Sequence, residues 1–527
     1  MTKKALILIA LTIGMMSAQA GALVAQAQEP PKEPETGAQA KPTEPKPPAD
    51  AAAAKEESSI TEHSIQIGGQ TIPYKATAST TLLKNAKDEP VALMYSTAYV
   101  RSDVKDPSQR PIAFIYNGGP GSASVWLHMG AFGPRRVVTE NAEPTGPGPY
   151  QIVDNPDCLL DKTDMVFIDP IGTGFSHVVA KGENKDFWGV DEDVRSLAQF
   201  IKIYLDRNGR WNSPKFLIGE SYGTFRSVAL GNYLEDHDGI YINGIVLISS
   251  VLDLSTLEFN TGDDRSYIFY LPSYAAAAWY YKTLKNRPDD LDAFLKQARD
   301  FAANEYATAL MKGSNITDAE KTTIANKLSD FTGISADYFV KANLRVNLAQ
   351  FEAELQRSRG LVVGRYDARY SGPAPDLIAE SASYDPSFSA VSGAFTAAIN
   401  AYLRQDLKFN PEMTYEVLPD DISAHWNWKH NEGPGSFPGA PSVDPDLVSA
   451  FIDNTHLRVQ VENGFFDMAT PFFATEYTMD HLGLPANLRS RIEFEYYRSG
   501  HMIYLNEKEL PRLKANVGGF IDEATRP

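Results

Sequence analysis

The sequence predicts an α/β protein whose mainly parallel central sheet is covered by helices. Four short runs, at 112–116, 165–168, 216–218 and 245–248, are apolar at every position. Strands of this kind are buried on both faces, which is typical of parallel sheets. Residues 191–204, between two of these runs, place apolar residues at helical spacing. Strands that alternate with helices indicate the α/β class.

Further strands are expected on both sides of these runs. Alternating apolar residues flank Gly68-Gly69 and predict a β-hairpin over 64–74. Residues 91–100 predict another strand. The sheet is expected to resume near the C-terminus with strands at 457–461 and 492–496.

A long stretch interrupts the alternation of strands and helices. From about residue 255 to 454 the sequence is dominated by segments typical of helices, such as 270–281 and 291–309. We therefore expect a first part of the core at 59–254, a mostly helical lid insertion at 255–454 and a second part of the core at 455–527.

The N-terminus has the pattern of an export signal. Lys3 and Lys4 precede the apolar run 5–16, and small residues allow cleavage after Ala20 or Ala27. The run is shorter than the ~20 residues of a membrane span. We expect residues 1–27 to be a signal peptide, with a retained anchor as the alternative, and no stable membrane insertion after cleavage. The style of the signal suggests a bacterial periplasmic or secreted protein.

Composition narrows the function classes. Residues 28–58 are rich in Pro, Glu and Ala without hydrophobic periodicity, which predicts a disordered linker. The formal net charge of −18 argues against nucleic-acid binding, which needs clustered cations. Cys158 is the only cysteine, so no intrachain disulfide is possible and we assign it no role. No histidine spacing resembles a metal motif, and no metal or cofactor is expected.

The motif GESYG at 219–223 centres the predicted chemistry on Ser221. In a G-x-S-x-G elbow the serine occupies a strained turn between a strand and a helix, and small neighbours expose its hydroxyl. The motif alone is weak, but a buried strand precedes it and the helix-compatible segment 224–234 follows. An ordinary glycine-rich turn is the alternative.

A nucleophilic serine needs a base and an acid, which follow it in the chain in this type of fold. Asp467 comes after the predicted strand 457–461, and His501 follows the last predicted strand. His481 lies in a helix-like stretch and is expected at the surface. Asp453 and Asp480 are weaker acid candidates because neither lies just past a strand. We therefore predict Ser221, Asp467 and His501 as the catalytic triad.

Two backbone N–H groups are expected to stabilise an oxyanion. One is that of Tyr222, directly after the nucleophile. The other belongs to the glycine-rich loop 117–121 after the strand 112–116, and we assign it to Gly119. A phosphate-loop interpretation fails because no Gly-Lys-Ser/Thr sequence closes this run.

Four motifs resemble those of the serine carboxypeptidases, with the same order and spacing. They are NGGPGS at 117–122, DPIGTGFS at 169–176, GESYG at 219–223 and SGHM at 499–502. The resemblance runs from about residue 90 to the C-terminus. It implies an α/β-hydrolase core with a helical lid, and removal of C-terminal residues from peptides with a free C-terminus. It also implies that Asn117, Gly118 and Glu220 bind the terminal carboxylate of the substrate.

The sequence departs from the family pattern at two positions near these motifs. Ser122 stands where a cysteine is common, so one disulfide is missing. Ala131 stands where a second glutamate often pairs with the one matching Glu220. A glutamic acid donates a hydrogen bond to a carboxylate only when it is protonated. We hypothesise that the pKa of Glu220 is less raised here than in the family.

Two other functions fit the same residues. An esterase or acyltransferase would use the same triad and acyl-enzyme with a different acceptor. An inactive binding protein is the third possibility, which the intact triad disfavours. Aromatic residues of the predicted lid either line a substrate pocket, with a preference for apolar side chains, or simply pack its helices: Tyr267, Phe269, Tyr270, Tyr274, Trp279 and Tyr280.

Overall fold

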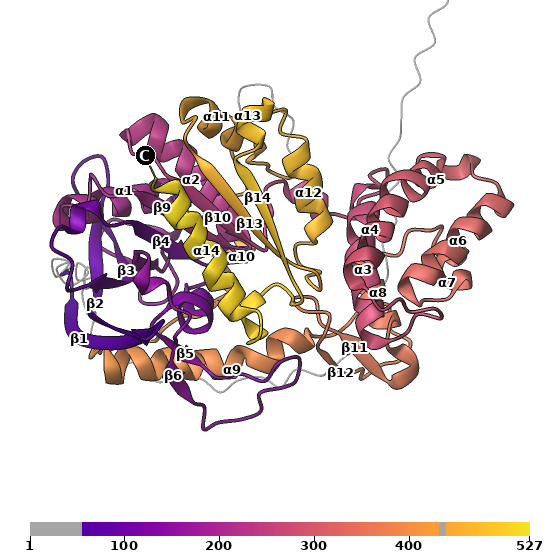
Figure 1. Ribbon diagram of the computed structural model, residues 1–527, viewed down its shortest axis with the longest axis horizontal. Coiled ribbons are helices and arrows are strands. Elements are labelled where there is room, and N and C mark those ends of the chain that lie inside the picture. Colours follow the sequence, from indigo (N-terminus) through magenta and orange to yellow (C-terminus); the bar gives the residue numbers. More distant parts are fainter. Residues whose placement is uncertain (1–54, 432–438, 527) are drawn as a thin grey trace, which may run out of the picture. The chain divides into compact units, whose positions relative to one another are not determined.

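A computed structural model describes residues 55–431 and 439–526. The predicted signal peptide and most of the predicted linker lie outside the described residues. The structure is built around a ten-stranded sheet, shown in Figure 1. Its strands are β1 (Ser58–Ile67), β2 (Gln70–Lys84), β3 (Pro90–Arg101), β4 (Ile112–Tyr116), β7 (Asp164–Ile168), β8 (His177–Val178), β9 (Lys215–Glu220), β10 (Gly244–Ile248), β13 (Arg458–Gly464) and β14 (Ile492–Tyr497).

The sheet is mixed but mostly parallel, as the sequence predicts. Its order is β1-β2-β3-β7-β4-β9-β10-β13-β14, with β8 paired to β3. The strands from β7 to β14 run parallel, and β1, β2 and β3 add antiparallel pairs at one edge. The expected hairpin turns at Gly68 and Gly69, which both have positive φ, a conformation that glycine adopts without strain.

The helices are α1 (Val190–Asn208), α2 (Tyr222–Asp238), α3 (Arg265–Tyr281), α4 (Leu291–Phe301), α5 (Ala307–Met311), α6 (Asp318–Thr332), α7 (Ala336–Lys341), α8 (Leu348–Glu354), α9 (Pro386–Ala401), α10 (Asp420–Ala424), α11 (Asp444–Asp453), α12 (Phe472–Asp480), α13 (Ala486–Arg489) and α14 (Leu510–Ala524). The expected helix 291–309 is divided by a π-helical turn at Ala302–Tyr306, and a second such turn occupies Leu127–Phe132. Two small sheets pair β5 (Arg135–Val137) with β6 (Ile152–Asp154), and β11 (Leu361–Val363) with β12 (Ser371–Pro373).

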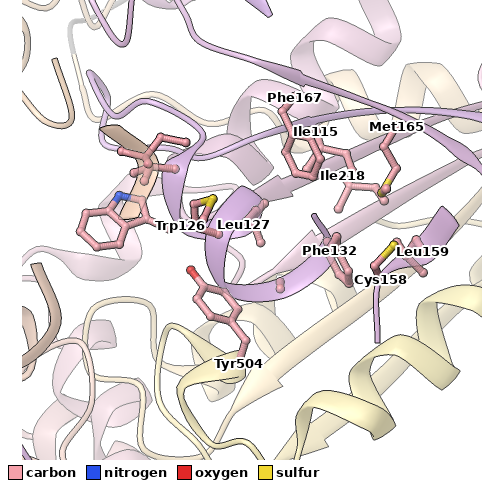
Figure 2. Close-up of a cluster of buried hydrophobic side chains, with 14 of the residues drawn as sticks. Ile115, Trp126, Leu127, Phe132, Cys158, Leu159, Met165, Phe167, Ile218 and Tyr504 are labelled. Atoms are coloured by element: carbon pink, nitrogen blue, oxygen red, sulfur yellow. The ribbon is translucent and has the colours of Figure 1, made fainter. Parts of the chain in front are cut away.

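Alternation along the central strands explains why they are apolar throughout. Ile112 and Phe114 of β4 pack into one hydrophobic cluster with α1, α2 and α11. Ala113 and Ile115 face the opposite cluster, which contains residues of α9, α14 and the π-helical turn 127–132. Figure 2 shows part of the second cluster, including Ile115, Phe132 and Tyr504. Because successive side chains of a strand point to opposite faces, both sets must be apolar.

Residues 255–454 contribute to two different parts of the structure. Helices α3 to α8 build a hydrophobic cluster of their own, which also takes in Phe465, Phe466 and Phe472 after β13. Figure 1 shows these helices gathered beside α12, and α3 contacts α12 directly. In contrast, α9 packs against the central sheet through Val391 and Phe395.

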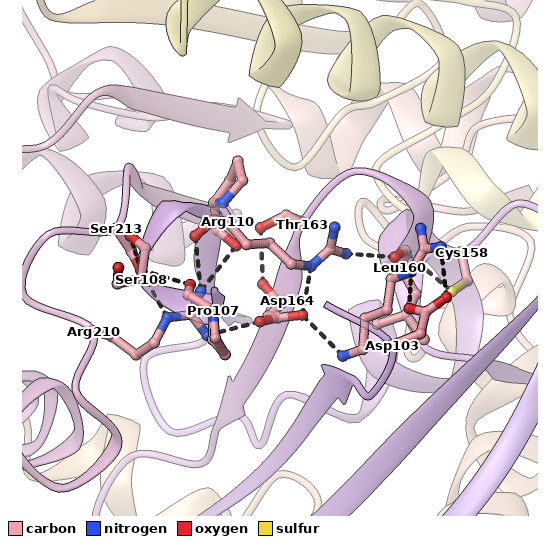
Figure 3. A network of polar contacts seen from close by, with 12 residues as sticks. Asp103, Pro107, Ser108, Arg110, Cys158, Leu160, Thr163, Asp164, Arg210 and Ser213 are labelled. Carbon is pink, nitrogen blue, oxygen red and sulfur yellow. Dashed lines mark hydrogen bonds and ion pairs between the residues drawn. The ribbon is translucent and has the colours of Figure 1, made fainter. Parts of the chain in front are cut away.

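A buried ion network holds the amino ends of the parallel strands. Asp164, the first residue of β7, is fully buried. It forms ion pairs with the guanidinium groups of Arg110 and Arg210 at 2.7 Å each (Figure 3). Breaking a buried pair of this kind is strongly destabilising because the remaining charge lacks a partner. The network fixes one end of the sheet, and the candidate site lies at the carboxyl end.

Candidate active site

Ser221 occupies the sharp turn that joins β9 to α2. Its backbone has φ 61° and ψ −132°, a strained conformation for a residue with a side chain. A Cβ atom on Gly219 would lie 2.1 Å from the carbonyl oxygen of Gly223, and one on Gly223 would lie 3.0 Å from that of Tyr116. The two glycines of the motif are therefore needed for the turn to pack. This geometry is that of a nucleophile elbow.

The predicted acid and base lie together. His501 Nδ1 donates a hydrogen bond to Asp467 Oδ2 at 2.8 Å, and both side chains are buried. The N–H groups of Ala469 and Thr470 donate to Asp467 Oδ1 at 2.8 and 2.9 Å. The Thr470 hydroxyl lies 2.8 Å from Asp467 Oδ2. The carboxylate is thus oriented toward the imidazole.

The electrostatics suit His501 as a base. Burial alone favours the neutral imidazole, but the charge and the hydrogen bond of Asp467 raise the pKa of His501 above its ordinary value of 6.5. His501 and Ser221 line the same pocket. An imidazole held by a buried carboxylate, in the same pocket as a serine, is the set of groups that removes a hydroxyl proton during acyl transfer.

The glycine-rich loop 117–121 lies against the start of α2. A Cβ atom on Gly118 would approach the backbone nitrogen of Tyr222 to 2.4 Å, and Gly119 has φ 102°. In the described part of the chain, the N–H groups of Gly119 and Tyr222 donate to no other group. The loop residue next to Gly119 thus lies directly against the backbone nitrogen of Tyr222. The amino end of α2 adds a favourable partial positive charge.

Asn117 and Glu220 are hydrogen-bonded to each other inside this pocket. Asn117 Nδ2 donates to Glu220 Oε1 at 2.9 Å, while Asn117 Oδ1 accepts from the N–H of Leu127 at 3.0 Å. Arg226, buried and paired with Asp193 at 2.5 Å, donates to the carbonyl oxygen of Asn117. The side-chain amide is therefore held through both its nitrogen and its oxygen, and Arg226 holds the backbone of the same residue.

The surroundings of Glu220 favour its protonated form. Burial raises the pKa of Glu220 to about 7, against smaller opposing effects of His501, Tyr504 and Asn117. Its Oε1 accepts from Asn117 and from the Tyr504 hydroxyl, at 3.3 Å, whereas the buried Oε2 makes no hydrogen bond within the described residues. The pKa of Glu220 is thus raised even though Ala131 replaces the second glutamate of the family pattern. Whether the rise is smaller than in the family stays a prediction.

Tyr504 was not singled out from the sequence. It follows the predicted base by three residues, and its ring fills the space beside Gly130, where a Cβ atom would lie 2.5 Å from the ring. Ala131 is buried in the same cluster. A tyrosine hydroxyl, rather than a second carboxyl group, therefore contacts Glu220. Only the position of Tyr504 near His501 could have suggested it.

The apolar walls of the pocket do not come from the aromatic residues of the predicted lid. Tyr270 and Tyr274 are buried in the packed interior of the helices α3 to α8. None of the six aromatic residues named for the lid lines this pocket, and the buried ones follow the alternative expectation, packing of the lid helices. Apolar side chains from other segments line it instead: Trp126, Tyr366, Phe388, Leu418 and Met502.

Comparison with known proteins decides the family. The family model described as Serine carboxypeptidase matches residues 73–355, which is more than half of the chain. The chain belongs to the serine carboxypeptidase family. This is a family of hydrolases, and the matched residues include the predicted nucleophile and the glycine-rich loop, whereas Asp467 and His501 lie beyond them.

Individual relatives of this serine carboxypeptidase family member are distant. It is 28% identical over 169 residues to serine carboxypeptidase-like 51 of Arabidopsis thaliana, covering 30% of this chain and 34% of that protein. Serine carboxypeptidase-like 22 of the same plant is 21% identical and covers 76% of each chain. The chain thus spans about a third of the first of these relatives and three quarters of the second.

A solved structure supports the fold. The crystal structure of Kex1(delta)p, a prohormone-processing carboxypeptidase from Saccharomyces cerevisiae, aligns with a TM-score of 0.51 at 15% identity. The alignment covers 84% of this chain and 92% of the yeast chain. The predicted α/β-hydrolase-like fold, with a mostly parallel sheet and helical insertions, is confirmed. Among the residues that the structure describes, no helix is both long and apolar enough to cross a membrane.

Proposed function

We propose that this protein is a serine-type carboxypeptidase that releases the C-terminal amino acid of peptides through an acyl-enzyme on Ser221. The observation that carries the proposal is the Asn117–Glu220 pair in the same pocket as Ser221 and His501. A protonated Glu220 Oε2 and the amide of Asn117 can both donate to a substrate carboxylate. A pocket that binds a free C-terminus beside a nucleophile selects the last peptide bond.

The proposed reaction assigns one step to each of these groups. His501 removes the proton of the Ser221 hydroxyl as it attacks the last peptide carbonyl, and Asp467 stabilises the resulting imidazolium. The N–H groups of Gly119 and Tyr222 stabilise the oxyanion. His501 then gives its proton to the leaving amino group, and water hydrolyses the acyl-enzyme by the same route.

Asn117, Gly118 and Glu220 would hold the leaving residue by its carboxylate. Binding a carboxylate next to an ionised Glu220 would place two like charges together, which is unfavourable. Activity on free-carboxylate substrates therefore needs the protonated form of Glu220. The apolar walls formed by Trp126 and Phe388 support a preference for an apolar C-terminal side chain.

The proposal also covers where the protein acts and how its chain is divided into domains. The basic start and apolar run of residues 1–27 support export from a bacterial cell into the periplasm or the medium, with residues 28–58 as a tether. We place the core at 59–254 and 455–527 and the insertion at 255–454. Within that insertion, the helices from α3 to α8 form the separate packing unit.

Hydrolysis of three matched substrates tests the proposed function. An N-blocked dipeptide with an apolar C-terminal residue is compared with its C-terminal amide and its ethyl ester, for the native chain and for Ser221→Ala. We expect release of the last amino acid from the free acid, and its loss in the variant. Cleavage of the ester alone would instead indicate an esterase or acyltransferase.

A further inference from the structure

Arg365 lies in the backbone segment that connects the acid and the base of the triad. The carbonyl oxygen of Arg365 accepts a hydrogen bond at 3.1 Å from the N–H of Met468, the residue after Asp467. The next carbonyl, of Tyr366, accepts from the N–H of His501 at 2.6 Å. The tyrosine ring packs 5.2 Å from the imidazole, centroid to centroid. Arg365 is therefore held at a fixed place beside the triad.

The side chain of Arg365 is a cation without a partner. It is exposed, and within the described residues its guanidinium makes neither a hydrogen bond nor an ion pair. Its only close contact of this kind is the ring of Tyr366, 5.4 Å from Cζ to the centroid. By comparison, Arg369, four residues later, is buried and binds Asp367 at 2.6 Å. The structure thus leaves one arginine of this segment free to bind an anion.

Two acidic side chains, Glu352 and Asp385, lie within electrostatic reach of this cation, but neither forms an ion pair with it in the described residues. Burial raises the pKa of Glu352, on α8, to about 8, so that this carboxyl is neutral at and below neutral pH. Asp385 accepts from the N–H of Tyr366 at 3.2 Å and from the N–H of Ser387 at 2.8 Å. Tyr270 of α3 is also close enough for the charge of Arg365 to act on it. The positive charge reaches His501 as well, where it opposes protonation.

The path of a bound peptide suggests what this cation binds. In the proposed function the C-terminal residue lies in the pocket of Asn117 and Glu220, which Tyr366 lines and Arg365 does not. The acyl part of the peptide must leave that pocket past Ser221 and His501. We propose that Arg365 binds an acidic side chain of the acyl part, and that the preferred substrates carry Asp or Glu just before the scissile bond. The inference rests on the proposed function, since it concerns the same reaction.

The test varies only the acyl residue. N-blocked dipeptides X-Phe, with X as Glu, Gln or Ala, are compared by kcat/KM in the native chain, in Arg365→Gln and in Arg359→Gln. Arg359 is an exposed arginine of the preceding turn and serves as the matched control. A charge-assisted hydrogen bond predicts roughly tenfold higher kcat/KM for Glu than for Gln. This ratio should fall to about one in Arg365→Gln and stay unchanged in Arg359→Gln.

A second series separates this inference from the proposed function. The same acyl groups are presented as ethyl esters of the single blocked residue, which require no carboxylate site. If esters but no peptides are cleaved, the proposed function is wrong, and the ratio between the Glu and Gln esters still tests Arg365. If neither series is cleaved, the blocked amino acids are compared for protection of Ser221 against a fluorophosphonate label. Equal values for Glu and Gln in the native chain, in whichever assay responds, would overturn the inference without reliance on any variant.

Discussion

The Tyr504 hydroxyl donates a hydrogen bond to Oε1 of Glu220 across 3.3 Å. The Asn117 amide donates to the same oxygen. Both donors stabilise the ionised carboxylate, whereas burial stabilises the protonated form and raises the pKa to about 7. In the proposed function, the balance between the donors and burial sets the pH range in which Glu220 donates to a substrate carboxylate.

Tyr504→Phe should extend activity toward higher pH. Removing one donor to the carboxylate raises the pKa of Glu220, by up to about one unit if the hydrogen bond is of ordinary strength. The alkaline limb of kcat/KM for a free-acid dipeptide should shift upward by that amount, mainly through KM. The profile for the corresponding ester should not move. An unchanged limb would mean that Tyr504 only fills space beside Gly130.

Glu220→Gln should remove the alkaline limb altogether. A glutamine amide donates at every pH, so carboxylate binding no longer depends on a proton near pH 7. The native chain should lose kcat/KM for free-acid substrates as the pH rises through about 7, and the variant should not. The acidic limb, which reports protonation of His501, should persist in both. A variant profile that still falls above pH 7 would contradict the assigned role of Glu220.

Gly130→Ala should destabilise the fold. The added methyl group would lie 2.5 Å from the Tyr504 ring and 3.1 Å from Phe395. Overpacking of a buried site typically costs about 1–3 kcal/mol. The midpoint of urea unfolding measures this effect. Gly519→Ala is the matched control because that glycine, in α14, is exposed and has no neighbour within 4 Å; it should be neutral or slightly stabilising.

How much of the site could be predicted depends on how local its signals are. The three residues of the proposed triad, Ser221, Asp467 and His501, each follow a strand, so chain order and strand ends were enough to propose them. The contact between Glu220 and Tyr504, in contrast, depends on the packing of two segments that are 284 residues apart in sequence. No local pattern encodes such a contact.

The same distinction applies to the fold. Strand periodicity predicted the central sheet because burial on both faces leaves a continuous apolar run. Periodicity did not reveal that α9 packs against one face of the central sheet, whereas α3 to α8 form a hydrophobic cluster of their own. All these helices have apolar residues at similar spacing, and the difference lies in which surface each one covers.

His430 should make stability depend on pH. Burial alone would lower its pKa, but hydrogen bonds to Asp191 and Asp446, at 2.7 and 3.0 Å, raise it to about 9. The stabilisation is fully present below the unfolded-state pKa of about 6.5 and is lost as the pH rises through about 9. His430→Asn should therefore lower the free energy of unfolding at pH 6, on the order of 1–3 kcal/mol, and much less at pH 10.

Denaturant unfolding at the two pH values checks this prediction. His481→Asn is the control, because His481 is exposed at the end of α12 and makes no ion pair in the described residues. The control should unfold like the native chain at both pH values. An equal loss of stability at pH 6 and pH 10 in His430→Asn would show that the imidazole acts through packing and not through its charge.

The most direct test of the central claim is the ratio of kcat/KM for an N-blocked dipeptide to that for its C-terminal amide, measured at pH 6 with the native chain and with Ser221→Ala. A carboxypeptidase that binds the free carboxylate through Asn117 and Glu220 should strongly prefer the free acid and lose both activities in the variant. Equal rates for acid and amide, or activity that survives the loss of Ser221, would contradict the account.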